Sequence, residues 1–297
     1  MQELIILWKK LKSYFIPQQV LIRLALGSES QGYKDLKKRI IEYLLVEDSL
    51  RNSAVINFLR KNPLHIFPYP FIYKYKPIDV VVKYSQGFPY VVYEGKKLFF
   101  KKNMNKMQVM HAMNNLLIEQ DEESAHHYYS FCSKSQYGVI IDCGAAEGIF
   151  ALKYIDLCEK MIIIETDPEW IAALQMTFSE YERKVSIIGK YVGERNDSHN
   201  ITLDTIIGQE NVSLIKVDVD GSEEGLFNGL KNSLTSNKID QILLCVYHDV
   251  DDYQKYTLLL DEYGFKVETH HNKMIFLYGN HLREPFLTNG VVNFYKA

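Results

Sequence analysis

Apolar and polar residues follow two different rhythms along the chain, and the rhythm changes near residue 60. Before that point apolar residues recur at spacings of three and four in residues 4–15, 36–45 and 53–61, which is the spacing of amphipathic helices. Residues 62–77 then carry four of the chain's eight prolines together with many aromatic residues. That composition is typical of an extended connector packed on a surface.

The next segment has the pattern of β-hairpins. Residues 79–100, "DVVVKYSQGFPYVVYEGKKLFF", place β-branched and aromatic runs on either side of "SQG" and "EGKK", which predicts a pair of hairpins. A helix is expected over residues 106–118, and it leads into the polar segment 119–130. We therefore predict that residues 1–105 form a helical and β-hairpin extension, acting as a cap or a dimer contact, ahead of a main domain over 106–297.

From residue 137 onward, short apolar runs alternate with helix-like stretches as far as residue 270. Continuous apolar strands separated by helices are typical of a parallel sheet covered on both faces. The last apolar runs, 274–279 and 291–297, can supply an antiparallel closing strand. The pattern predicts an α/β fold of the Rossmann-like kind, with a mostly parallel sheet and helices on both faces.

Composition narrows the class of partner. The chain has 297 residues, is 47% hydrophobic and 24% charged, and has a formal net charge of -3, so no overall field favours nucleic acid or a membrane surface. No apolar run is long enough for a membrane span. Lysines follow the first apolar run rather than precede it, which is the wrong order for a signal peptide. Its four cysteines form no C-x-x-C pair, and we expect a cytoplasmic protein.

The turn in "VIIDCGAAEGIF", residues 139–150, is the first candidate ligand site. Dinucleotide and phosphate loops need G-x-G-x-x-G or G-x-x-x-x-G-K-[ST]. Here Asp142 is followed by Gly144, Ala145, Glu147 and Gly148. The position two residues after Gly144 holds no glycine, and no lysine follows Gly148. Glu147 would also repel a phosphate. The turn therefore favours a cationic nucleoside without phosphate, and S-adenosylmethionine (SAM) is the candidate.

Two later strand ends extend this hypothesis. Glu165 follows the second strand about 20 residues after the turn, where an acidic side chain accepts hydrogen bonds from ribose hydroxyls, and Thr166 lies beside it. Glu165 could instead cap the helix near Pro168, although Asp167 is the better cap. Lys190 and Tyr191 follow the third strand, at the expected edge of an adenine slot.

A third charged stretch lies in "SLIKVDVDG". Alternation places Lys216, Asp218 and Asp220 on one face of a strand that ends at Gly221. Charges in a buried strand are costly unless they pair or serve a site. Asp218 could simply form a salt bridge with Lys216. His248 closes the fifth strand in "CVYHD", and it could either act chemically or hold backbone atoms.

Several motifs together resemble one family. "LIKVDVDGSEEGLFNGL" looks like the signature of the FkbM-type SAM-dependent methyltransferases, and "ITLDTII", "IDCGAAEGIFAL", "ETDPEW" and residues 245–267 resemble its other elements. The likeness covers about residues 89–270. It implies a seven-stranded SAM methyltransferase fold and methyl transfer, usually to a hydroxyl oxygen of a sugar or other small acceptor. The implied cofactor contacts are Asp142, Gly144, Ala145, Glu147, Gly148, Glu165, Thr166, Lys190, Tyr191 and Asp218.

A hydroxyl acceptor needs a base as its proton leaves. His248 and Asp218 are the candidates, with Asp220 behind them. His126 and His127 lack a third ligand at diagnostic spacing, so we expect no metal. Aromatic rings in residues 66–75 or 128–131 could line the acceptor cleft.

Two other functions stay open on sequence grounds. An NAD-dependent oxidoreductase would need glycine where Ala146 stands. A SAM-binding module without turnover would keep the same pocket. The expected partner is a small-molecule or carbohydrate acceptor, with a homodimer possible through the extension.

Overall fold

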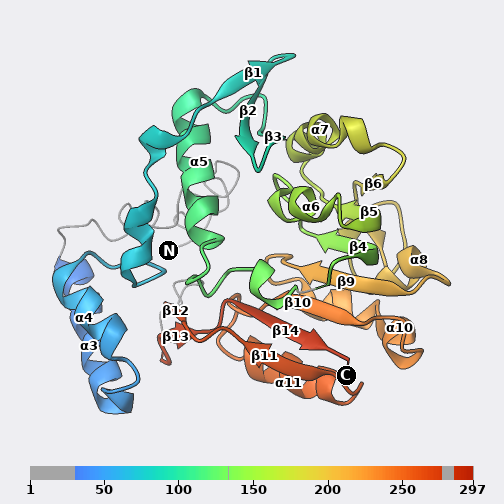
Figure 1. The fold of residues 1–297 in the computed structure, drawn as a ribbon. Helices are drawn as coiled ribbons and strands as arrows, with labels where there is room; N and C mark the ends of the chain where they lie inside the picture. Colours follow the sequence, from blue (N-terminus) through green and yellow to red (C-terminus); the bar gives the residue numbers. More distant parts are fainter. Residues whose placement is uncertain (1–30, 133, 276–283, 297) are drawn as a thin grey trace.

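A computed structural model describes residues 31–132, 134–275 and 284–296. The helix expected over residues 4–15 and most of the run 274–279 lie outside these residues. The described part contains one large sheet of seven strands (Figure 1). Its strand order is β11 (Lys266–Thr269), β14 (Val291–Tyr295), β10 (Gln241–Cys245), β9 (Val212–Val217), β4 (Tyr137–Cys143), β5 (Cys158–Ile164) and β6 (Val185–Ile188).

The sheet is mixed rather than mostly parallel. The five strands from β10 to β6 pair in parallel, as expected. β14 lies between β10 and β11 and is antiparallel to both. An antiparallel neighbour needs no crossover helix, and β14 is the strand of the large sheet that follows β11 in the chain, after the short β13 (Leu287–Thr288). The run 291–297 therefore supplies the antiparallel strand, but inside the sheet rather than at its edge.

Side chains alternate between two cores because successive residues of a strand point to opposite faces. Ile140 and Ile163 pack with Phe150 and Leu174 in the first core, so α6 (Ile149–Tyr154) and α7 (Pro168–Thr177) cover that face. Strand residues such as Ile141 and Ile215 belong to the second core. Helices with side chains in that core are α8 (Leu203–Ile207), α9 (Glu223–Asn228), α10 (Lys231–Thr235) and α11 (Asp252–Asp261). Helices on both faces confirm the expected layering.

Within the described residues, the first helices are α3 (Gln31–Asp48) and α4 (Ser53–Lys61), which confirms the helical patterns of residues 36–45 and 53–61. The connector contains two short 3-10 turns, η1 (Pro70–Lys74) and η2 (Pro77–Asp79), each opening with proline. Phe67 and Phe71 are buried, so the connector packs on a surface as expected. It then runs beside α5 (Lys106–Glu119) toward the hairpins (Figure 1).

Both predicted hairpins are present as β1 (Lys83–Ser85), β2 (Phe88–Tyr93) and β3 (Lys96–Phe99). Each two-residue turn has positive φ at both positions, Gln86 with Gly87 and Glu94 with Gly95, which matches the twist of antiparallel strands. The Phe99 amide donates to Thr177 Oγ1 at 3.0 Å, and Lys101 Nζ lies 2.5 Å from Asp167 Oδ2. The small sheet is thereby attached to α7.

The remaining elements are short: β7 (Tyr191–Val192), β8 (Asn200–Ile201), β12 (Met274–Ile275), η3 (Tyr129–Phe131) and η4 (Ser179–Tyr181). Among the helices of the described residues, none combines the length and apolar character that a membrane span requires.

Candidate active site

The turn after β4 is tightly constrained by its two glycines. Gly144 has φ +74°, and a Cβ there would lie 1.8 Å from the carbonyl oxygen of Asp218. Gly148 has φ +82°, and a Cβ would lie 2.6 Å from Leu174 Cδ2. Only glycine combines this backbone conformation with such close approach. The turn is therefore pressed against the end of β9 on one side and against α7 on the other.

Glu165 closes the open side of this turn. Its Oε2 accepts the Ala146 amide at 2.9 Å, and its Oε1 accepts the amides of Thr166 at 2.6 Å and Asp167 at 2.8 Å. Asp167 is the cap of α7, since it accepts amides from the first turn of that helix. The prediction that Asp167 is the better cap is confirmed, and the Glu165 carboxylate is held beside the glycine turn.

Lys216 pairs with Asp142 rather than with Asp218. The two residues are direct neighbours across β9 and β4, and Nζ lies 3.2 Å from Asp142 Oδ1. The ammonium also donates to the Gly144 carbonyl at 2.6 Å. Burial lowers the pKa of Lys216, but Asp142 and Asp218 together raise it above its ordinary value. This buried pair holds the turn and the end of β9 together.

Asp218 lies one residue beyond β9 and is held by three side chains. Tyr128 donates to Oδ2 at 3.2 Å, Tyr247 donates to Oδ1 at 3.1 Å, and His248 Nε2 lies 3.4 Å from Oδ1. Because Tyr247 gives its proton to Asp218, its oxygen accepts from His126 Nε2 at 3.0 Å. Burial would raise the pKa of Asp218, but His248 and Lys216 lower it far below the ordinary range. Asp218 is therefore a fixed anion.

His248 lies between two carboxylates. Its Nδ1 is 2.9 Å from Glu223 Oε1, and its Nε2 faces Asp218. Burial alone would lower the pKa of His248, but Asp218 and Glu223 raise it to about 10, so the imidazole is a cation near neutral pH. Asp220 lies farther away, at 3.8 Å from His248 Nε2, with 68% of its side chain exposed. β9 ends at Val217 and Asp220 has φ +55°, so the expected strand alternation does not extend to it.

Two acidic side chains near this centre form no ion pair with a lysine, arginine or histidine of the described residues. Glu147 in the turn is buried, and burial raises its pKa to about 7. Glu119, at the end of α5, has its pKa raised to about 8 by burial and then by Glu147 and Asp218. Within the described ranges, neither carboxyl has an ion pair. The donor set thus has an excess of buried acid, which fits a cationic ligand.

Lys190 and Tyr191 lie apart from this cluster. Lys190 Nζ donates to the carbonyl of Asp197 at 2.9 Å, and Tyr191 is 60% exposed in β7. Both residues come after the end of β6. In the sheet β6 lies next to β5, and Glu165 directly follows β5. No contact joins either side chain to Asp218 in the part of the chain that the structure describes.

Sequence reasoning missed several members of the cluster. Tyr247 and Cys245 stand in the quoted motif "CVYHD" without having been singled out, and Glu119 opens the polar segment before His126. The fold also brings His126, Asp218 and Cys245 within 4.8 Å of one another. His126 Nε2, the Asp218 carboxylate and Cys245 Sγ each already have a hydrogen-bond partner in the hydroxyl of Tyr128 or Tyr247. The nearby His127 bonds Ser130 Oγ at 2.5 Å instead.

Several solved structures of methyltransferases are similar to parts of this chain. No curated protein matches the chain. A solved structure of methyltransferase FkbM from Methylobacillus flagellatus KT is similar, with 18% identity, TM-score 0.46 and coverage of 64% of this chain. The match spans about half, 54%, of that protein. Precorrin-6y C5,15-methyltransferase from Geobacter metallireducens GS-15 has 12% identity, TM-score 0.37 and coverage of 63% and 89% of the two chains.

A methyltransferase structure from Streptococcus mutans, in complex with S-adenosylhomocysteine (SAH), has 13% identity, TM-score 0.38 and coverage of 55% and 90% of the two chains. The decisive match is to a family model, the methyltransferase FkbM domain, over residues 86–267. It contains the glycine turn, Glu165, Asp218 and His248, and it covers more than half of the chain. The chain belongs to the FkbM methyltransferase domain family.

Proposed function

We propose that the protein is a SAM-dependent methyltransferase that methylates a hydroxyl oxygen of a small-molecule or carbohydrate acceptor. The observation that carries this proposal is the buried acid Glu147, with the half-buried Glu119 near it, at a glycine turn that has no phosphate-binding pattern. Every other buried acid of the centre already has a cationic neighbour: Asp142 has Lys216, and both Asp218 and Glu223 have His248. A cationic cofactor would complete the charge balance.

The residues that would hold SAM follow from the turn. Gly144, Ala145 and Gly148 would lie along the molecule with their backbone, and Glu147 and Glu119 would face its cationic part. Oε2 of Glu165 accepts only the Ala146 amide, so it keeps a second lone pair and would accept a ribose hydroxyl. Asp142 supports the turn through Lys216. Thr166, Lys190 and Tyr191, at the ends of the neighbouring strands, are proposed to border the adenine.

When bound, SAM supplies an electrophilic methyl group on a sulfonium sulfur. The acceptor hydroxyl must lose its proton as the new bond to carbon forms. We propose that Asp218 accepts a hydrogen bond from this hydroxyl and orients it, since Tyr128, Tyr247 and His248 fix its position. Because the pKa of Asp218 lies far below the ordinary range, the proton would pass on to water as the bond to carbon forms. His248, as a cation, keeps Asp218 ionised rather than accepting the proton itself. Asp220, which is exposed on the outer side of His248, would tune that cation.

The role of the remaining chain is also a proposal. Residues 1–105 would cap the acceptor side of the site, with a homodimer contact as a second use of the same segment. The protein would act in the cytoplasm on a small molecule and not on nucleic acid.

Transfer of label from [methyl-³H]SAM tests the proposal. Asp218→Asn should lower transfer by about 100-fold or more, because the amide does not replace the fixed carboxylate that orients the hydroxyl, while SAH binding and folding are retained. Asp240→Asn, an exposed change far along the sheet, is the matched control and should keep full transfer. Undiminished transfer in Asp218→Asn would refute the role proposed for Asp218. SAH binding with no transfer in the wild-type protein would instead indicate a binding module without turnover.

A further inference from the structure

Strand β1 forms a free edge of the small three-stranded sheet. Among the described residues it pairs with β2 alone. In this pairing Tyr84 lies opposite Pro89, which has no N–H, so the two residues cannot exchange both backbone hydrogen bonds. Because the bonding direction alternates along an antiparallel strand, the backbone groups of Val82 and Tyr84 point away from β2. The outer side of β1 can therefore accept another strand.

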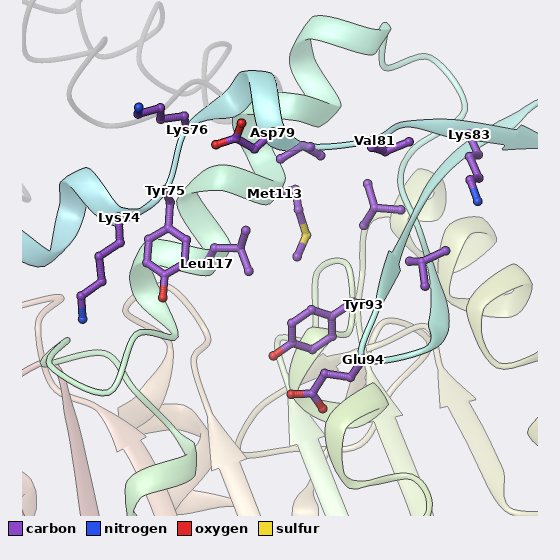
Figure 2. Close-up of a pocket in the computed structure, with 13 residues that line it drawn as sticks. Lys74, Tyr75, Lys76, Asp79, Val81, Lys83, Tyr93, Glu94, Met113 and Leu117 are labelled. Atoms are coloured by element: carbon purple, nitrogen blue, oxygen red, sulfur yellow. The ribbon is translucent and has the colours of Figure 1, made fainter.

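The segment that leads into β1 is extended and exposes one of its faces. η2 ends at Asp79, and Val80 follows with φ -80° and ψ 117°. Val80 and Val82 pack against the first core. Asp79, Val81 and Lys83 alternate with them and are exposed, Val81 to 68%. Figure 2 shows these three side chains in this order between η2 and β1. The exposed face thus carries a valine with an acid on one side and a base on the other.

The two charges of this face are not neutralised within the described part of the chain. Lys74 pairs with Asp121 and Glu123, but neither Asp79 nor Lys83 takes part in an ion pair there. A lysine on an edge strand ordinarily opposes pairing with another strand. It does so no longer when the approaching strand brings a carboxylate to the same place.

The sequence of this segment is complementary to itself when two copies run antiparallel. Residues 79–83 read "DVVVK". A two-fold axis at Val81 places Asp79 opposite Lys83 of the second copy, and the same contact forms again at the other end. Val80 then faces Val82 of the second copy. Opposite charges and apolar side chains that face each other across strands both stabilise an antiparallel pair.

Other registers leave the charges unmatched. With the axis at Lys83, the two copies of this lysine would lie opposite each other, and like charges in that position are destabilising. With the axis at Val82, Asp79 would lie opposite Ser85, and no ion pair would form. Charge complementarity therefore selects the register centred on Val81.

We propose that two copies of this chain associate through the outer edge of β1, with the two-fold axis at Val81. The contact is isologous, and it carries an ion pair between Asp79 and Lys83 at each end. Ile78 and Tyr84, which are 76% and 57% exposed, lie just beyond these ion pairs and extend the apolar contact. A strand edge of this length is at the small end of specific interfaces, so we expect a weak dimer with a Kd on the order of 10–100 µM.

Sedimentation velocity of the full-length protein over about 2–200 µM tests the role of the charges. Asp79→Lys and Lys83→Asp each bring like charges together at both ends, and each should weaken dimerisation by about 10-fold or more. The double variant Asp79→Lys/Lys83→Asp restores opposite charges and should regain the dimer. Lys97→Asp, an exposed reversal on β3 of the same sheet, is the matched control and should dimerise as the wild type does. A wild type that is monomeric throughout, or a dimer that Lys83→Asp leaves intact, overturns the inference.

A cysteine at the proposed axis tests the register. Since Val82 and Tyr84 carry the outward backbone groups, the two copies of Val81 form a pair without hydrogen bonds, whose Cα atoms lie about 4.5 Å apart. This distance is within the range of a disulfide. Val81→Cys should therefore give a disulfide-linked dimer under mild oxidation. Val92→Cys replaces a valine of β2 that is 52% exposed, and it should not. Absence of the link in Val81→Cys, or equal linking in both variants, overturns the inference.

The melting temperature of each variant shows that it is folded. Neither experiment involves SAM, and none of the substituted residues belongs to the candidate active site. A failed dimer therefore leaves the proposed methyl transfer standing, and a failed transfer leaves the dimer standing.

Discussion

Gly144 is the position where the structure leaves least freedom to a side chain. Gly144→Ala would place a Cβ 1.8 Å from the Asp218 carbonyl oxygen at φ +74°, so the turn or the end of β9 must shift. We expect a loss of about 2–4 kcal/mol in the free energy of unfolding, together with loss of SAH binding, because the turn and Asp218 no longer meet. Urea denaturation and SAH titration measure the two effects.

Gly95→Ala is the matched control for this prediction. Gly95 also has positive φ, +82°, but a Cβ there meets no atom within 4 Å. It should cost only about 1 kcal/mol and leave SAH binding unchanged. Equal losses in the two variants would show that close approach to Asp218 is not what restricts Gly144.

At the scale of elements, the glycine turn and the end of α5 each contribute one acidic side chain that forms no ion pair within the described residues. Glu147 and Glu119 have pKa values raised to about 7 and about 8 from an ordinary value of 4.5. Between about pH 4.5 and about pH 8 the folded protein therefore holds protons that the unfolded chain has released. Stability without ligand is greatest below this window and is lost as pH rises through it. SAH affinity should rise over the same upper range, because the cation meets carboxylates.

Glu119→Gln tests this pH dependence. The variant should unfold at a higher temperature than the wild type near pH 8.5, by about 2–5 °C, and its SAH affinity should change less with pH. Glu182→Gln, an exposed acid beyond α7, should behave as the wild type in both measurements. A wild-type melting temperature that rises between pH 6 and pH 8.5, with no effect of Glu119→Gln, would contradict the assignment.

Sequence patterns predicted most elements because local signals agree with the fold. The hairpin turns at Gly87 and Gly95 and the Asn105–Gln108 capping box of α5 are examples of local chemistry that fixes an element. Insertion of β14 between β10 and β11 could not be predicted, since strand order depends on pairing across long stretches of chain.

The candidate site was predicted in part for the same reason. Asp142 lies in the last residues of β4, and Glu165 and Asp218 follow β5 and β9, so the topology of a parallel sheet brings them to one edge. Glu119, Tyr128 and Tyr247 come from a helix end, a loop and a strand end, and only the folded chain shows that they meet. His248 was expected as a base, but its state depends on Glu223, whose side chain reaches it from α9. Such tertiary neighbours leave no periodic signal.

At the scale of the whole molecule, the carboxyl ends of the sheet carry buried acids, which we propose meet a cationic donor. The Lys101–Asp167 ion pair and the hydrogen bond from the Phe99 amide to Thr177 hold the small hairpin sheet against α7. The extension is therefore expected to contribute to acceptor choice rather than to cofactor binding.

The central claim is that the turn after β4 binds a cationic adenosyl cofactor and not a phosphate-bearing dinucleotide. Calorimetric titration with SAM near pH 8, repeated with SAH and in the presence of NAD, measures it directly. We predict one SAM or SAH bound per chain with a Kd on the order of micromolar, no displacement by NAD, and SAM affinity at least about 10-fold weaker in Glu147→Gln. Absence of SAH binding, or displacement of SAH by NAD, would contradict the claim.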